Sequence, residues 1–106
     1  MASKNKRAIY PIHPGTVLVG ELVELGMSVA DLACTLRVSY SRIHRLVSGR
    51  CAMTADTALR LQQWLGVSAD FWMSLQRQYE LDFVAEAGDG KIQRTVERRS
   101  PQDRAS

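Results

Sequence analysis

Apolar residues recur three and four positions apart along most of this chain, with polar residues between them. That spacing places the apolar side chains on one face of an α-helix. Residues typical of helix starts divide the pattern into five predicted helices, which begin after His13, Ser28, Ser39, Thr54 and Ser68. Gly26, Gly49 and Gly66 mark three of the ends, because glycine adopts a positive φ without steric cost. The pattern therefore predicts an all-α fold.

Residues 27 to 50 hold two short predicted helices joined by the turn Arg37-Val38, an arrangement that suits a helix-turn-helix. Their apolar faces are formed by Val29, Leu32, Ala33 and Leu36 in the first helix and by Ile43, Leu46 and Val47 in the second. A turn after a helix often needs a left-handed residue, and an arginine there costs about 1 kcal/mol relative to glycine. Either this turn avoids a positive φ or the protein tolerates the cost at Arg37.

The polar face of the second helix in this pair carries the functional signal. Tyr40, Ser41, Arg42, His44 and Arg45 fall outside its apolar stripe. Hydrogen-bond donors and cations near a helix N-terminus suit the DNA major groove, where arginine can bond guanine O6 and N7 together. The alternative is an ordinary amphipathic helix with a solvated basic face.

The composition permits nucleic acid as a partner without requiring it. The chain has 106 residues, which suits one domain, and a formal net charge of +3. Cys34 and Cys51 lack CxxC spacing and His13 lies far from His44, so neither a zinc site nor another metal or cofactor is expected. Reduced thiols in a cytosolic protein are the simplest interpretation, with Cys34 as a small packing residue.

Nothing in the apolar pattern predicts a membrane segment. No apolar run approaches the roughly 18 residues needed to span a bilayer. The start M-A-S-K-N-K-R-A-I-Y also lacks the apolar core of a signal peptide. We therefore expect a soluble intracellular protein without membrane partners.

The fifth predicted helix, from Ala69 to about Ala85, is apolar on more than one stripe. Its large apolar residues are Phe71, Trp72, Leu75, Tyr79, Leu81 and Phe83. A small domain buries only one face of a terminal helix, so a second apolar face predicts a partner surface. Acidic residues also gather here, while the arm and the turn region are basic, which predicts that one end of the molecule faces DNA.

The chain divides into three predicted regions. Residues 1 to 11 form a basic arm, interpreted as a flexible terminus or as a segment that follows phosphates. Residues 12 to 86 form the helix-turn-helix domain. Residues 87 to 106 form a basic tail that is disordered, contains a short strand at 92–96, or orders on a partner.

Four motifs follow one another along the chain: I-H-P-G-T-V-L at 12–18, L-V-S-G-R at 46–50, T-A-D-T-A-L-R-L at 54–61 and S-A-D-F-W-M-S-L-Q-R-Q-Y-E-L at 68–81. In this order they resemble the HigA-type antitoxins of the Xre (lambda-repressor-like) class. The resemblance covers roughly residues 10 to 86. It implies a five-helix repressor-like domain without catalytic activity, in the bacterial cytoplasm and associated with the nucleoid.

The resemblance also implies partners. The protein would be a homodimer that binds palindromic operator DNA, represses its own operon and neutralises a HigB-type, RelE-like mRNA interferase. The terminal helix would contribute the dimer contact, with Phe71, Trp72, Leu75, Tyr79 and Phe83 as its residues. For the toxin, the first helix and the arm rank ahead of the tail as binding surfaces.

Carried over by position, the family's recognition helix corresponds to Ser39, Tyr40, Ser41, Arg42 and Arg45. Ser28 starts the scaffold helix, where its N–H or hydroxyl can meet a phosphate, and Arg50 follows the glycine of the next loop. Arg37 departs from the family, since many relatives have glycine there, although it can also lie against a phosphate. Tyr40 is bulkier than the short polar residue common at its position.

The sequence is also compatible with other functions. A stand-alone regulator of the same fold, without a toxin, fits the sequence almost equally well. A protein-interaction module that no longer binds DNA is a third reading, against which the exposed arginines argue. An enzyme is the least expected, because the sequence holds no Ser-His-Asp grouping, no metal-ligand spacing and no phosphate-binding glycine loop.

Overall fold

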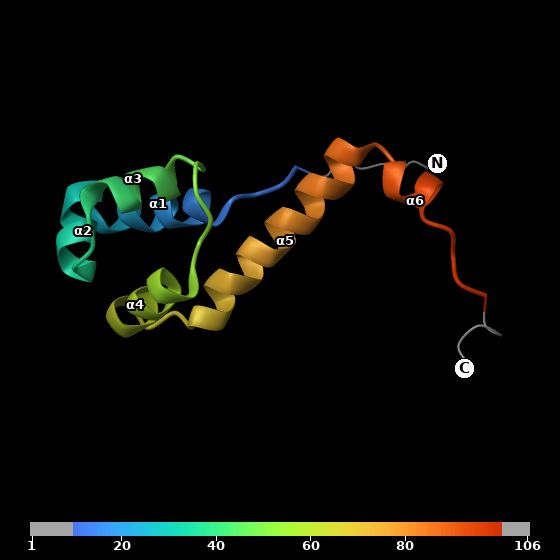
Figure 1. Ribbon diagram of the computed structural model, residues 1–106. Coiled ribbons are helices and arrows are strands. Elements are labelled where there is room, and N and C mark those ends of the chain that lie inside the picture. Colours follow the sequence, from blue (N-terminus) through green and yellow to red (C-terminus); the bar gives the residue numbers. More distant parts are fainter. Residues whose placement is uncertain (1–9, 101–106) are drawn as a thin grey trace.

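The computed structural model describes residues 10 to 100, and these residues form helices and no strands. The helices are α1 (Pro14–Leu25), α2 (Val29–Leu36), α3 (Tyr40–Val47), α4 (Ala55–Leu65), α5 (Ala69–Gly88) and α6 (Lys91–Thr95). The predicted all-α fold is confirmed (Figure 1). Residues 1 to 9 of the predicted basic arm lie outside the described residues, as do residues 101 to 106 of the predicted tail.

Side-chain caps start the helices where the sequence predicted them. The hydroxyls of Ser28, Ser39, Thr54 and Ser68 each accept a hydrogen bond from the backbone N–H three residues later. His13 caps α1 instead through Nδ1, which accepts from Gly15 N at 2.9 Å. These bonds satisfy N–H groups that have no partner inside the helix, so each helix has a defined first turn.

The first five helices enclose one core. Its buried members come from α1 to α4, from the segment before α4 and from α5, which adds one tryptophan; they are Leu18, Leu22, Leu32, Ala33, Leu36, Ile43, Leu46, Met53, Ala58, Leu61 and Trp72. Met53, in the segment before α4, is 2% exposed, and its N–H donates to Oε1 of the buried Gln76 at 2.8 Å. The segment before α4 is therefore fixed to α5.

α1 and α3 cross at very short range through Gly15. A Cβ added at this glycine would lie 2.1 Å from the carbonyl oxygen of Leu46. No side chain larger than hydrogen fits there without moving the backbone of α3. Gly15 thus sets the position of α3, the helix predicted to contact DNA.

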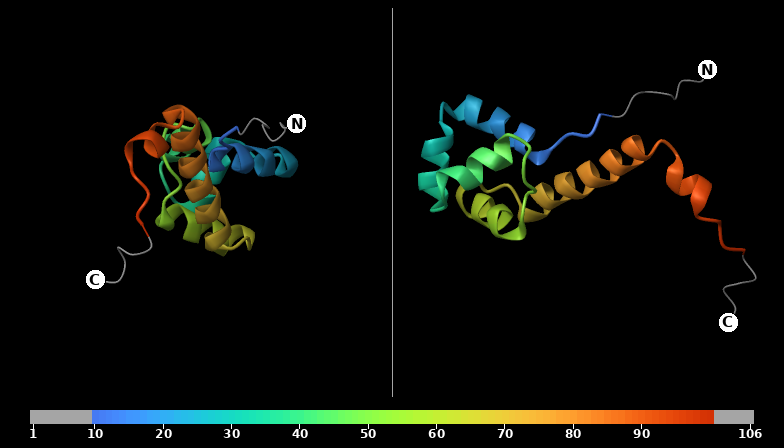
Figure 2. Two further views of the ribbon diagram at one scale, coloured as in Figure 1. Left: turned by 90° about the vertical axis from the view of Figure 1, so that its right-hand side faces the viewer. Right: turned by 45° about the horizontal axis from the view of Figure 1, so that its top comes forward.

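The second half of α5 projects from the domain and carries α6 at its far end (Figures 1 and 2). The radius of gyration is 18.3 Å. A compact chain of this length would have a value of about 13 Å. The short strand considered for residues 92–96 is wrong, because Lys91 to Thr95 form α6 and Gly90 begins that turn in a left-handed conformation.

Two further expectations are corrected by burial. Trp72 is 1% exposed and belongs to the core of its own chain, so its predicted place in a dimer contact is wrong. Periodicity identified the apolar stripes of α5 but not the stripe that faces the core. Cys34, expected as a packing residue, is exposed on α2.

Candidate nucleic-acid interface

The end of α2 settles the question raised by Arg37. Its φ is 61° and its ψ 44°, so the turn uses the left-handed conformation and the protein tolerates the cost of a side chain there. The N–H of Val38 donates to Ala33 O at 3.0 Å, which closes the turn. Arg60 Nη1 of α4 donates to Leu36 O at 2.9 Å. The turn is therefore held both by its own backbone and by α4.

The start of α2 is held by a reciprocal capping box. Ser28 Oγ accepts from Asp31 N, and Asp31 Oδ2 accepts from Ser28 N, each at 3.0 Å. Hydrogen bonds to the Asp31 carboxyl, first from the Ser28 backbone N–H and then from the Ser28 hydroxyl, hold its pKa below its ordinary value. The Ser28 N–H predicted for a phosphate therefore already has a partner within the capping box.

The outer face of α3 brings four of the eight predicted DNA-contact residues together. Ser39, Tyr40, Ser41 and Arg45 are all exposed, on or directly before this helix. The rings of Tyr40 and His44 stack at a centroid distance of 5.6 Å, with 21° between their planes. The face therefore offers hydroxyls, a flat pair of rings and one guanidinium, while Ile43 and Leu46 hold the opposite face in the core.

Arg42 differs from the other residues predicted for this face. Its Nη2 donates to Thr57 Oγ1 at 2.8 Å and its Nε donates to the same oxygen at 3.2 Å. Its guanidinium also pairs with Asp56 of α4. The side chain is thus directed toward α4, and Arg42 ties the recognition helix to the first turn of that helix.

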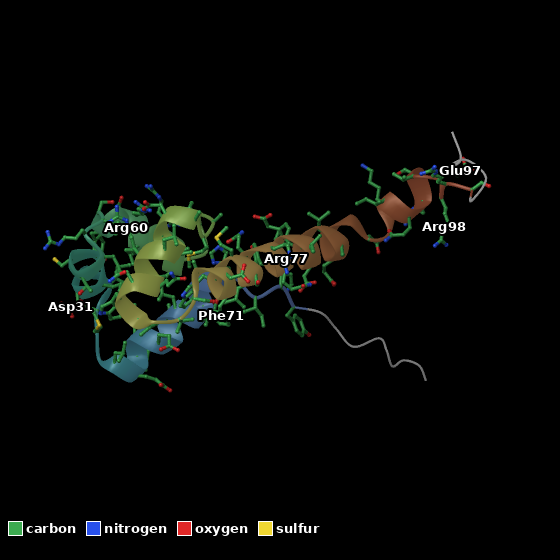
Figure 3. All side chains as sticks on the ribbon, turned by 90° about the horizontal axis from the view of Figure 1, so that it is seen from below. Asp31, Arg60, Phe71, Arg77, Glu97 and Arg98 are labelled. Atoms are coloured by element: carbon green, nitrogen blue, oxygen red, sulfur yellow. The ribbon has the colours of Figure 1, made fainter. Side chains whose placement is uncertain are left out.

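Asp56 joins Arg42 to the turn after α2. It also accepts from Arg60 Nε at 2.8 Å, and Arg60 in turn bonds Leu36 O, as described above. Figure 3 shows Arg60 at the helix-turn-helix end of the molecule, away from α6. Hydrogen bonds from Arg60 and then from Arg42 hold the pKa of the Asp56 carboxyl below its ordinary value. We call Arg42, Asp56, Thr57 and Arg60 the α4 bracket.

The remaining predicted contacts lie at the two ends of the same surface. Arg37 is exposed in the turn before α3, and Arg50 is exposed just after Gly49, which has a φ of 76°. Residues 27 to 50 carry four arginines and one aspartate, so this surface attracts an anion.

The sequence interpretation missed part of the site. The α4 bracket was not predicted, although Asp56 and Arg60 stand four residues apart, the spacing of a helical ion pair. His44 was noted as exposed but not placed among the DNA contacts, although it is four residues from Tyr40. Ser48, whose hydroxyl donates to His44 O at 2.5 Å, was also left out.

The described residues were also compared with what a metal site, a catalytic histidine or a membrane-spanning helix requires. Within residues 10–100, no three His, Cys, Asp or Glu side chains converge in a way that could hold a metal ion. His13 is occupied by capping α1 and by an edge-on contact with the ring of Tyr79 at 4.9 Å. Over the same span of the chain, no helix combines the length and apolar content needed to cross a membrane.

The five-helix core and the basic outer face of α3 define a helix-turn-helix DNA-binding protein of the lambda-repressor-like class. No family model matches the chain. Its curated relatives include virulence-associated protein I of Dichelobacter nodosus, 42% identical over 77 residues, which cover 72% of this chain and 71% of that protein. An uncharacterised HTH-type transcriptional regulator of Escherichia coli, YddM, is 32% identical over 76 residues, 72% of this chain and 80% of the regulator.

Solved structures extend the comparison over the whole fold. An addiction-module antidote protein of the HigA family from Coxiella burnetii has a TM-score of 0.82 and 36% identity, covering 86% of this chain and all of that one. Antitoxin HigA of Pseudomonas aeruginosa, solved with the higBA promoter, has a TM-score of 0.79 and 38% identity, covering 83% and 97%. The chain therefore belongs to the HigA family of helix-turn-helix antitoxins.

Proposed function

We propose that this protein is the antitoxin of a type II toxin–antitoxin module and the repressor of its own operon. The observation that carries the proposal is the exposed face of α3, which presents Tyr40, Ser41 and Arg45 on a helix fixed to the core. Relatives support it, because HigA of Pseudomonas aeruginosa is solved with the higBA promoter and antitoxin GraA with its operator. The bound DNA is a palindromic operator upstream of the protein's own gene.

A palindrome requires a homodimer, which places two recognition helices about 34 Å apart, one turn of DNA. Helix α5 supports this role, since Phe83 on its projecting half is 52% exposed and Phe71 in its first turn is 43% exposed. Leu75 and Tyr79 are half-buried beside them. Apolar groups of this size gain free energy when a second copy covers them.

The toxin partner is a HigB-type, RelE-like mRNA interferase, and the antitoxin neutralises it without catalytic activity of its own. Support comes from the family and from the outer side of α1, where Val23 is 73% exposed and Val19 is 38% exposed. Gly20 lies on this helix with open space around it. Exposed valines that no other part of residues 10–100 covers suit a protein contact.

The alternative is a stand-alone regulator without a toxin, which the likeness to the regulator YddM favours. Co-expression with the neighbouring open reading frame separates the two functions. The antitoxin must co-purify with that product and restore the growth that the product alone prevents. A reporter fused to the upstream DNA must also be repressed. Repression of the reporter without rescue of growth would instead support a stand-alone regulator.

A further inference from the structure

His44 lies on the outer face of α3, as Arg45 does. Successive residues of an α-helix turn by about 100° around its axis. Ile43 and Leu46 mark the side of α3 that faces the core, and this spacing puts Ser41 opposite them. By the same spacing, His44 and Arg45 lie about 60° and about 40° to either side of Ser41. A ligand that covers the Arg45 side of this face therefore also meets His44.

The imidazole edge of His44 is free to bind a ligand. Its ring stacks on Tyr40, which covers one face of the imidazole and leaves the edge with both nitrogens open. Within residues 10–100, neither of these nitrogens has a hydrogen-bond partner. His13 differs, because its Nδ1 caps α1. An imidazole carries an N–H donor in both its neutral and its charged form, so His44 adds a donor to this face of α3.

Tyr40 fixes the orientation of that donor. The two residues are four positions apart, so they lie one above the other on the helix surface. Their centroid distance of 5.6 Å is within the range over which aromatic rings attract each other. A side chain that is already held in one orientation loses less conformational entropy when it binds. The stack therefore prepares the imidazole for a ligand that approaches its edge.

Guanine is the base whose edge suits a single donor best. In the major groove it presents two adjacent acceptors, N7 and O6, and no donor. Adenine places its N6 amino group beside N7, thymine places a methyl group beside O4, and cytosine presents a donor. An imidazole N–H that enters the groove thus meets acceptors without a competing donor only at guanine.

We propose that His44 is a specificity-determining residue, which donates a hydrogen bond to N7 of one guanine in each half of the operator. Tyr40 is the positioning residue that holds the imidazole in place. The proposal rests on the DNA-binding function proposed above and adds to it one residue and one kind of base. Because two recognition helices read a palindrome, each half carries one such guanine.

The test replaces each operator guanine in turn by 7-deazaguanine, which lacks the N7 acceptor but keeps its base pairing. Fluorescence anisotropy with the full chain gives the ratio of the Kd for modified DNA to the Kd for unmodified DNA. In wild type, one guanine in each half must give a ratio of about two to ten, the effect of one lost hydrogen bond. His44→Ala must give a ratio near one at that guanine. Arg45→Ala must keep the wild-type ratio there, although it binds both DNAs more weakly.

Two Tyr40 variants test the positioning role through the same ratio. Tyr40→Phe keeps the ring, so it must keep the wild-type ratio, whatever the loss of the hydroxyl does to the overall affinity. Tyr40→Ala removes the ring and must lower the ratio, while circular dichroism shows that the helices are intact. An unchanged ratio in Tyr40→Ala would overturn the role of the stack.

Three other results separate the failure of this contact from the failure of the proposed function. A wild-type ratio in His44→Ala at every guanine would overturn the base contact. Uniform weakening of all DNAs by His44→Ala, with a lower salt slope, would assign His44 to a phosphate and also overturn it. A wild-type chain that does not bind the DNA upstream of its own gene would instead remove the proposed function, and this contact with it.

Discussion

Arg37 holds the left-handed position that closes α2, where glycine would fit without a Cβ penalty. Replacing Arg37 by glycine should therefore raise the free energy of unfolding by about 1 kcal/mol, measured by urea denaturation. If Arg37 also contacts a phosphate, the same variant should bind operator DNA more weakly although it is more stable. A loss of stability in Arg37→Gly would contradict the strain assigned to this residue.

Arg42 and Arg45 stand three residues apart on α3 but have different surroundings. Arg42→Ala removes the guanidinium that donates to the buried Thr57 hydroxyl, so it should lower the free energy of unfolding by about 1 kcal/mol. Arg45→Ala should leave stability unchanged, because Arg45 is exposed on the outer face of the helix. Chemical denaturation of both variants measures this difference, and equal stabilities would refute the role given to the α4 bracket.

The α4 bracket also makes the free energy of unfolding depend on pH. The pKa of Asp56 is lower in the folded chain than its ordinary value of 3.8, so folding favours the ionised carboxylate. Its contribution is complete above that ordinary value and is lost as the pH falls through the lower folded-state pKa. Urea titrations between pH 5 and pH 2 should show a smaller loss of stability for Asp56→Asn than for wild type. If wild type and Asp56→Asn lose the same amount of stability over this pH range, the Asp56 carboxylate does not make the assigned contribution.

Among the elements, the crossing of α1 and α3 is the most sensitive to a single methyl group. Gly15→Ala places a Cβ against the Leu46 carbonyl, so it should destabilise the chain by about 1–3 kcal/mol and displace the recognition helix. Gly20→Ala is the matched control in the same helix, since nothing lies within 4 Å of its added Cβ. Alanine there should stabilise α1 by about 0.5–1 kcal/mol.

Thermal unfolding and operator binding of these two glycine variants test the crossing together. Gly15→Ala should lose both stability and affinity, and Gly20→Ala should lose neither. Equal behaviour of the two variants would show that the close approach of α1 and α3 does not set the position of α3.

The sequence could predict hydrogen bonds between residues close together in the chain, but not those between residues far apart. The starts of α2 to α5 were predictable because Ser28, Ser39, Thr54 and Ser68 bond backbone groups only three residues away. The bonds of Arg42 to Asp56 and Thr57 span 14 and 15 residues, so they depend on how α3 packs on α4. The pattern of apolar residues contains no such information.

α5 shows the same limit at the level of a whole element. Its length and its several apolar stripes were predictable from spacing. Burial of Trp72 at 1% and exposure of Phe83 at 52% were not, because both belong to apolar stripes of one amphipathic helix. The last buried residue of α5 is Gln76, and only the packed structure locates that point. The helical form of residues 91–95 was also missed, since five residues carry too little periodicity to separate helix from strand.

On the scale of the whole molecule, the two functions lie at opposite ends. The helix-turn-helix and its arginines occupy one end, and the projecting part of α5 with α6 occupies the other (Figure 2). This separation would let the proposed dimer form through α5 while both α3 helices remain free to face DNA. It also allows a controlled comparison, in which an arginine at one end and an arginine at the other are each replaced by alanine. Both replacements change the net charge by the same amount, so any difference in DNA binding reflects position.

Operator affinity tests the central account most directly. The measurement is fluorescence anisotropy with the DNA upstream of the protein's own gene, at several salt concentrations. Arg45→Ala on α3 should weaken binding by 1–3 kcal/mol, about tenfold or more, if it bonds a base, or lower the salt slope by about one if it neutralises a phosphate. Arg98→Ala, beyond α6 in Figure 3, should bind as wild type does. Wild-type affinity and salt slope in Arg45→Ala would contradict the assignment of α3 as the DNA-reading helix.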